Sequence, residues 1–246
     1  MISFRRRHLK SRLSNAVMPD VARIALRPAL PLRRKTMRRQ PVYLLLDTSG
    51  SMRGEPIEAM KAGLSSLLSA LRRDPMALDS VCLTIITFDR QARVLCSLTP
   101  ADRLQMPDIE IPEDGPTMLG AALELAIESV ERDLVRRTAT TRGDYKPILF
   151  VMTDGKPSDI MLYRKMCERV RNGPFASVVA CAAGVRASQL HLKMLCDTVL
   201  ALDTADAAQF MAFFRWVSET IGETARSSLA VETNLPPPPA EILPPL

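Results

Sequence analysis

Two short segments carry oxygen-bearing side chains directly after runs of apolar residues. Asp47, Ser49 and Ser51 come at and after the end of the run over residues 42–46, and Asp154 follows the run over residues 148–153. Thr117 follows a Gly-Pro pair in the chain between them. Each feature alone is ordinary, because such residues at strand ends commonly satisfy backbone groups or cap helices. Together they would form a binding site if the fold brought them to one place.

The chemistry of this set is that of hard oxygen ligands, with two carboxylates, three hydroxyls and neither sulfur nor imidazole. Such donors suit Mg2+, and Mn2+ is an alternative. The two carboxylates only balance the charge of the ion, so an acidic side chain offered by a partner protein should complete its coordination shell. Only two histidines, His8 and His191, occur in the sequence, which argues against a zinc site or a histidine-based catalytic triad.

The elements that must position these residues follow from hydrophobic periodicity. Continuous apolar runs predict buried strands, and apolar residues at a spacing of three and four predict amphipathic helices. The link between the second and third strands is only three residues long, which requires a hairpin and therefore one antiparallel pair. Strands are predicted at residues 42–47, 81–88, 92–98, 148–153, 176–183 and 199–202, and helices at 56–73, 120–137, 158–171 and 205–221.

This alternation predicts an α/β fold: a doubly wound, Rossmann-like, mostly parallel six-stranded sheet with one antiparallel edge strand and helices on both faces. In a sheet ordered 3-2-1-4-5-6, strands 1 and 4 are neighbours, and ligands bind beyond their carboxyl ends. The two strands that end in Asp47 and Asp154 are strands 1 and 4. We therefore expect both carboxylates to face one cavity, with Ser49 and Ser51 on one rim and Thr117 on another.

The D-x-S-x-S motif at residues 47–51, Gly-Pro-Thr ending at Thr117 and Thr-Asp-Gly around Asp154 resemble the metal-ion-dependent adhesion site of the von Willebrand factor A family. The resemblance covers about residues 42–222. It implies that Ser49, Ser51 and Thr117 contact the ion, and that Asp47 and Asp154 do so directly or through water. A narrower resemblance, carried by the segments at residues 41–59, 85–89, 119–125 and 150–159, is to the TerY branch of bacterial tellurite-resistance and stress-response proteins.

That narrower resemblance implies a cytoplasmic adaptor with kinase-like and phosphatase-like partners, and not an enzyme. Two alternatives remain open at this stage. One is a docking subunit of a chelatase or AAA+ ATPase machine. The other is a Mg2+-dependent phosphohydrolase with Asp47 as nucleophile. Ser49 argues against this alternative, because aspartate-based phosphatases carry a second Asp at that position.

Charge and composition divide the chain into three parts. Residues 1–36 are rich in arginine and are predicted to be a disordered extension: a basic arm, a targeting segment, or a stretch ahead of a true start at Met37. Residues 37–225 are predicted to form the domain, and residues 226–246 a proline-rich, extended and solvated tail. No apolar run is long enough to cross a membrane. The arginines are not accompanied by aromatic residues that could stack on bases, so specific nucleic-acid binding is not expected. The five cysteines indicate reduced thiols in the cytoplasm.

Overall fold

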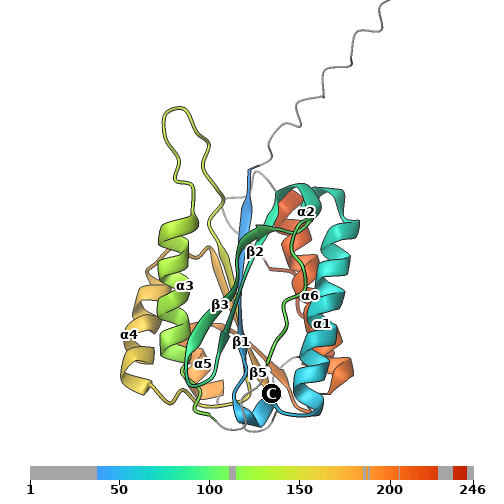
Figure 1. The fold of residues 1–246 in the computed structure, drawn as a ribbon, viewed down its shortest axis with the longest axis vertical. Coiled ribbons are helices and arrows are strands. Elements are labelled where there is room, and N and C mark those ends of the chain that lie inside the picture. Colours follow the sequence, from blue (N-terminus) through green and yellow to red (C-terminus); the bar gives the residue numbers. More distant parts are fainter. Residues whose placement is uncertain are drawn as a thin grey trace, which may run out of the picture. The chain divides into compact units, whose positions relative to one another are not determined.

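The computed structural model describes residues 38–110, 115–184, 187, 189–204, 206–226 and 235–242. Its centre is a six-stranded sheet with the order β3-β2-β1-β4-β5-β6 (Figure 1). All neighbouring strands are parallel except β2 and β3, which are antiparallel and place β3 at one edge. The strands are β1 (Gln40–Asp47), β2 (Val81–Phe88), β3 (Ala92–Pro100), β4 (Ile148–Thr153), β5 (Ser177–Ala183) and β6 (Thr198–Leu202).

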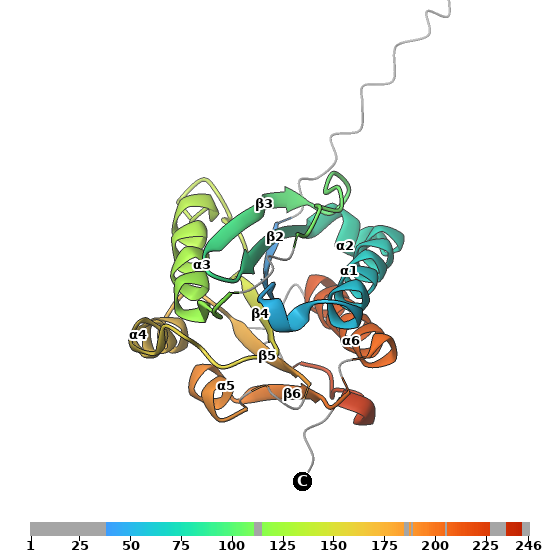
Figure 2. The same cartoon turned by 60° about the horizontal axis from the view of Figure 1, so that its bottom comes forward.

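In the part of the chain that the structure describes, six α-helices cover the two faces of this sheet. Figure 2 shows α1, α2 and α6 on one side and α3, α4 and α5 on the other. Their bounds are α1 (Glu55–Arg73), α2 (Pro75–Ser80), α3 (Leu119–Asp133), α4 (Ile160–Arg171), α5 (Gln189–Leu195) and α6 (Ala207–Arg226). The predicted fold class and strand order are therefore confirmed.

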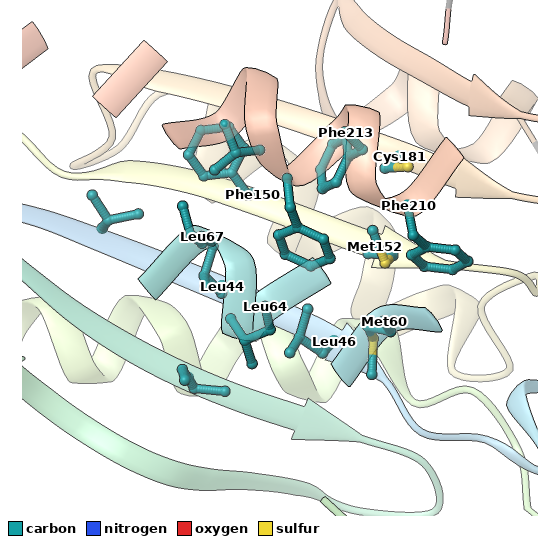
Figure 3. Close-up of a cluster of buried hydrophobic side chains, with 14 of the residues drawn as sticks. Leu44, Leu46, Met60, Leu64, Leu67, Phe150, Met152, Cys181, Phe210 and Phe213 are labelled. Carbon is teal, nitrogen blue, oxygen red and sulfur yellow. The ribbon is translucent and has the colours of Figure 1, made fainter. Parts of the chain in front are cut away.

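Alternate residues of the central strands face opposite layers of helices. In β1, Leu44 and Leu46 pack in the cluster under α1 and α6, whereas Tyr43 and Leu45 pack in the cluster under α3 and α4. Every residue of β1 and of β4 is buried, which explains why both strands read as uninterrupted apolar runs. Figure 3 shows part of the first cluster, where the side chains of α1 and α6 meet those of β1 and β4. The two strands that end in aspartate are thus held rigidly from both sides.

Two short helices were not anticipated, and one predicted helix is shorter than expected. Asp74 caps α2 by accepting from the N–H groups of Met76 and Ala77, and Pro75 occupies its first turn; an Asp-Pro pair is a recognisable start signal. The helix predicted to reach residue 137 ends at Asp133. The backbone there is satisfied from outside the helix, because the Asp133 carbonyl accepts from Arg39 and the Val135 N–H donates to a carboxylate of the following loop.

The part of the predicted tail that the structure describes is not fully solvated. Residues 235–242 lie against α6 and β6 (Figure 2), and the side chain of Ile242 is fully buried. Proline content indicates an extended backbone, but it does not exclude that the apolar residues flanking the prolines find a surface to pack on. The predicted basic extension over residues 1–36 lies outside the described residues.

All five cysteines are free thiols, and four of them are buried. Burial raises the pKa of Cys82 to about 11 and that of Cys196 to about 12, and it raises the pKa of Cys181 further. A thiol with so high a pKa is neutral and unreactive near pH 7. Among the helices of the described part of the chain, none is both long and apolar enough to span a bilayer.

Candidate metal centre

The chain turns sharply after β1, and polar residues of this turn bind the carboxylate at the end of the strand. The Oδ1 atom of Asp47 accepts a hydrogen bond from the Ser49 N–H at 2.8 Å, and its Oδ2 atom accepts one from the Thr153 hydroxyl at 2.5 Å. A short 3-10 turn (Gly50–Met52) follows and brings Ser51 alongside Ser49. Gly54, at a φ of 82°, lets the chain reverse into α1. The Asp47 carboxylate is fully buried and is held by Ser49, in the turn after β1, and by Thr153, the last residue of β4.

The hydroxyl of Ser51 joins this turn to the end of β4. It donates to the Oδ1 atom of Asp154 at 2.9 Å, while the Ser49 and Ser51 hydroxyl oxygens lie 3.2 Å apart. The neighbouring strands β1 and β4 are parallel, so their carboxyl ends open at the same edge of the sheet. The structure thus brings together four of the five residues singled out in the sequence through direct hydrogen bonds.

Thr117 approaches the same place from the loop before α3. A methyl group added to the Cα atom of Gly155 would lie 2.8 Å from the Thr117 hydroxyl oxygen, which places that oxygen beside the backbone that follows Asp154. Thr117 and Asp154 are each exposed by less than a tenth. Any side chain at residue 155 would push the hydroxyl away, so glycine is required there for close approach.

Two residues that sequence reasoning missed hold the Thr117 loop against the Asp154 loop. The Ser158 hydroxyl accepts from the Thr117 N–H at 3.1 Å, and the Ser158 N–H donates to the Thr117 carbonyl at 2.9 Å. Asp159 accepts from the N–H groups of Gly120 and Ala121, in the first turn of α3, at 3.0 and 2.8 Å. A Ser-Asp pair before a helix usually caps that helix. Here it caps a different one, α3, which only the tertiary structure shows.

A third buried carboxylate, Asp89, follows β2 at this edge of the sheet. Its Oδ2 atom accepts from Arg93 at 3.0 Å and lies 3.4 Å from the Thr48 hydroxyl, and its Oδ1 atom accepts from the Gln91 N–H. The arginine neutralises this carboxylate. We therefore assign Asp89 to holding the Thr48 turn in place, and not to a cation.

Electrostatics distinguish Asp47 from such a paired carboxylate. Burial raises the pKa of Asp47 to about 6, the hydrogen bonds from Thr153 and Ser49 partly oppose that rise, and the charge of Asp154 adds to it. Two carboxylates in a partly dry crevice repel each other, and a divalent cation between them would relieve both the repulsion and the desolvation. Within the described part of the chain, no group of three His, Cys, Asp or Glu side chains gathers as a metal site. A cation at this edge would thus depend on hydroxyl ligands as well as on the two carboxylates, which fits Mg2+ or Mn2+.

Comparison with known proteins agrees with this arrangement. Residues 42–209, more than half of the chain, match the model of the von Willebrand factor type A domain. The chain belongs to this family. The match begins in β1 and ends in the first turn of α6, so it includes all five residues at the carboxyl edge of the sheet. No curated protein sequence matches the chain.

Solved structures with the von Willebrand factor type A fold resemble the chain in architecture at low sequence identity. Proximal thread matrix protein 1 from the mussel byssus matches with a TM-score of 0.58 and 16% identity, over 74% of this chain and 48% of that one. A further structure of that mussel protein has a zinc-occupied MIDAS motif and matches with a TM-score of 0.53 and 16% identity, over 77% of this chain and 46% of that one. The pilus adhesin SpaC of Lactobacillus rhamnosus GG matches with a TM-score of 0.61 and 12% identity, over 77% of this chain and 31% of that one. The chain thus spans about half the length of these structures, or less.

Proposed function

We propose that this von Willebrand factor type A domain holds one divalent cation, Mg2+ or Mn2+, and uses it to bind an acidic side chain of a partner protein. The ligands would be Asp47, Ser49, Ser51, Thr117 and Asp154. When bound, the cation supplies an electrophilic centre for a carboxylate. The chain's own residues would bury the two aspartates and supply three neutral hydroxyls, and one group from outside would complete the coordination shell.

The observation that carries this proposal is the hydrogen bond from the Ser51 hydroxyl to the Asp154 carboxylate, which links the turn after β1 to the residue that follows β4. Without a cation, the hydroxyls partly satisfy the carboxylates. With a cation, the same oxygens can turn toward it with little movement of the backbone, because both strands are buried on both faces. A preformed site of this kind favours binding, because little ordering is needed when the ion arrives.

The finer part of the proposal concerns the cellular role. The segments around Asp47 and Asp154 support placing the chain with the TerY-like adaptors of a bacterial tellurite-resistance or stress-response system. Such an adaptor would work in the cytoplasm, would have no catalytic activity of its own and would bind kinase-like and phosphatase-like proteins. It would contact these proteins through the cation, and it would bind neither a specific nucleic acid nor a membrane.

Calorimetric titration with MgCl2 tests the cation site. Ser51→Ala and Asp154→Ala should lose at least ten-fold in Mg2+ affinity, because each removes a ligand. Asp203→Ala is the matched control: Asp203 also follows a strand at the carboxyl edge of the sheet but is exposed, so its affinity should equal that of the wild type. Equal Mg2+ affinity in all four proteins would refute the site.

Affinity capture from a bacterial extract, with and without chelator, tests the partner. Proteins that bind through the cation should be captured by the wild type and by Asp203→Ala in MgCl2, and lost on chelation and with Asp154→Ala. Identification of the captured proteins would then test the adaptor role. Capture that is indifferent to both the chelator and the substitution would contradict binding through the cation, even if the titration showed a site.

A further inference from the structure

The segment at residues 235–242 returns to the domain and packs against α6 and β6 (Figure 2). At one end, the indole Nε1–H of Trp216 donates a hydrogen bond to the carbonyl of Pro236 at 3.1 Å, and Leu235 packs against the apolar cluster under α1 and α6. At the other end, a 3-10 turn (Ala240–Ile242) closes with a hydrogen bond from the Ile242 N–H to the Pro239 carbonyl, and Ile242 is fully buried. The four prolines lie between these two apolar anchors.

The surface beneath the segment has the chemistry that recognises proline-rich chains. A run of prolines offers carbonyl acceptors but no N–H donors, so a protein reads it with side-chain donors and aromatic rings. Trp216 supplies the donor, because its indole N–H reaches the carbonyl of Pro236, and its ring packs against Phe150 of the core at 6.4 Å between centroids. The ring is buried, and this packing sets the direction of its donor.

Attachment of this kind is exchangeable. Pro236 to Pro239 can donate no backbone hydrogen bonds to the domain, so the segment cannot be locked in as an added β-strand would be. Its hold depends on the Trp216 hydrogen bond and on the apolar anchors at its two ends. A segment with stronger anchors could therefore take its place.

We propose that the surface formed by α6 and β6 around Trp216 is a docking site for proline-rich segments that carry an apolar residue at each end. Residues 235–242 fill it within the chain, and a proline-rich segment of a partner protein replaces them. A second copy of this chain is the weaker candidate, because its identical segment gains no contact and must compete with one tethered at an effective concentration of about millimolar. This surface is independent of the proposed cation site.

Trp216 is the only tryptophan in the sequence, so its fluorescence reports on this surface directly. Ile242→Asp should release the segment and shift Trp216 emission to the red, with greater quenching by acrylamide. Leu235→Asp, at the other end, should give the same change. Glu241→Gln is the matched control: Glu241 is exposed beside Ile242, so emission should match that of the wild type. Far-UV circular dichroism of each variant establishes that the domain remains folded.

A peptide with the sequence of residues 233–246 then tests recognition in trans. Added to Ile242→Asp, it should reverse the red shift, and it should bind this variant at least ten-fold more tightly than the wild type, in which residues 235–242 already cover the surface. A peptide with the four prolines replaced by alanine should bind at least ten-fold more weakly. Unchanged emission in both Asp variants, or equal binding of the proline and alanine peptides, would overturn the proposal. Concentration-dependent dimers with a buried Trp216 would also overturn it, in favour of exchange between copies.

Discussion

Replacing Asp47 by Asn separates the cost of burying its charge from the rest of the folding energy. The folded pKa of about 6 stands roughly two units above the ordinary value of 3.8, because the carboxyl is buried. At about 1.4 kcal/mol per unit, the ionised form should destabilise the cation-free domain by about 3 kcal/mol. Well below pH 4 the group is protonated in both states and contributes nothing. Between pH 4 and 6 the unfolded chain loses the proton first, so stability falls, and above pH 6 the loss is complete.

Asn keeps the shape of the side chain and cannot ionise. It still accepts from the Ser49 N–H, but the Thr153 hydroxyl loses its acceptor, which costs about 1 kcal/mol at every pH. The informative quantity is therefore the change with pH in the difference between the unfolding free energies of the two proteins, and not that difference at one pH. In chelator, the wild type should lose about 3 kcal/mol relative to Asp47→Asn between pH 4 and pH 8.

Urea unfolding of both proteins at several pH values measures this difference, with Asp102→Asn as a control for an exposed carboxylate. Saturating MgCl2 at pH 8 should restore the wild type and leave Asp47→Asn unchanged. A free-energy difference that stays constant within about 0.5 kcal/mol from pH 4 to 8 would refute the assignment of the raised pKa to Asp47 and the electrostatic argument for a cation.

Three further substitutions test the surroundings of the site. Gly155→Ala should displace the Thr117 hydroxyl, which would lie 2.8 Å from the new methyl group; Mg2+ affinity by calorimetry should fall at least ten-fold while the melting temperature changes little. Asp159→Ala should cost about 1–2 kcal/mol in urea unfolding, because the first turn of α3 loses two acceptors, and it should also weaken Mg2+ binding; unchanged stability would contradict the capping role. Gly63→Ala, away from the site, should cost about 1–3 kcal/mol by overpacking against Phe214, with Mg2+ affinity retained.

The sheet and the position of the candidate site could be predicted because the signals are local. Continuous apolar runs mark β1 and β4, the three-residue link marks the hairpin, and the order of strands in a doubly wound sheet then places Asp47 and Asp154 side by side. The short helices α2 and α5 could not be predicted because six or seven residues contain too few turns for a periodic pattern. The end of α3 was predicted too late because apolar Leu134 continues the helical spacing. In the structure, Arg39 and the following loop bind the backbone groups there, and the helix ends.

The residues that position Thr117 could not be predicted, for a different reason. Ser158 and Asp159 carry the signature of a helix start, and their use on the neighbouring helix depends on two loops meeting in space. Likewise, the prolines before Ile242 indicate an extended chain, but only the shape of the surface around Trp216 determines that this chain returns to the domain. In both cases the local pattern has more than one structural use, and long-range packing selects among them.

The thiols set a limit on what this domain could sense. Four of its five cysteines are shielded by the core and remain protonated at neutral pH, so oxidants that attack thiolates would find little to react with. Cys96, on the edge strand, is the partly accessible one. The proposed cation site uses oxygen ligands alone, so treatment of the domain with a thiol oxidant should leave the proposed binding of the cation unchanged.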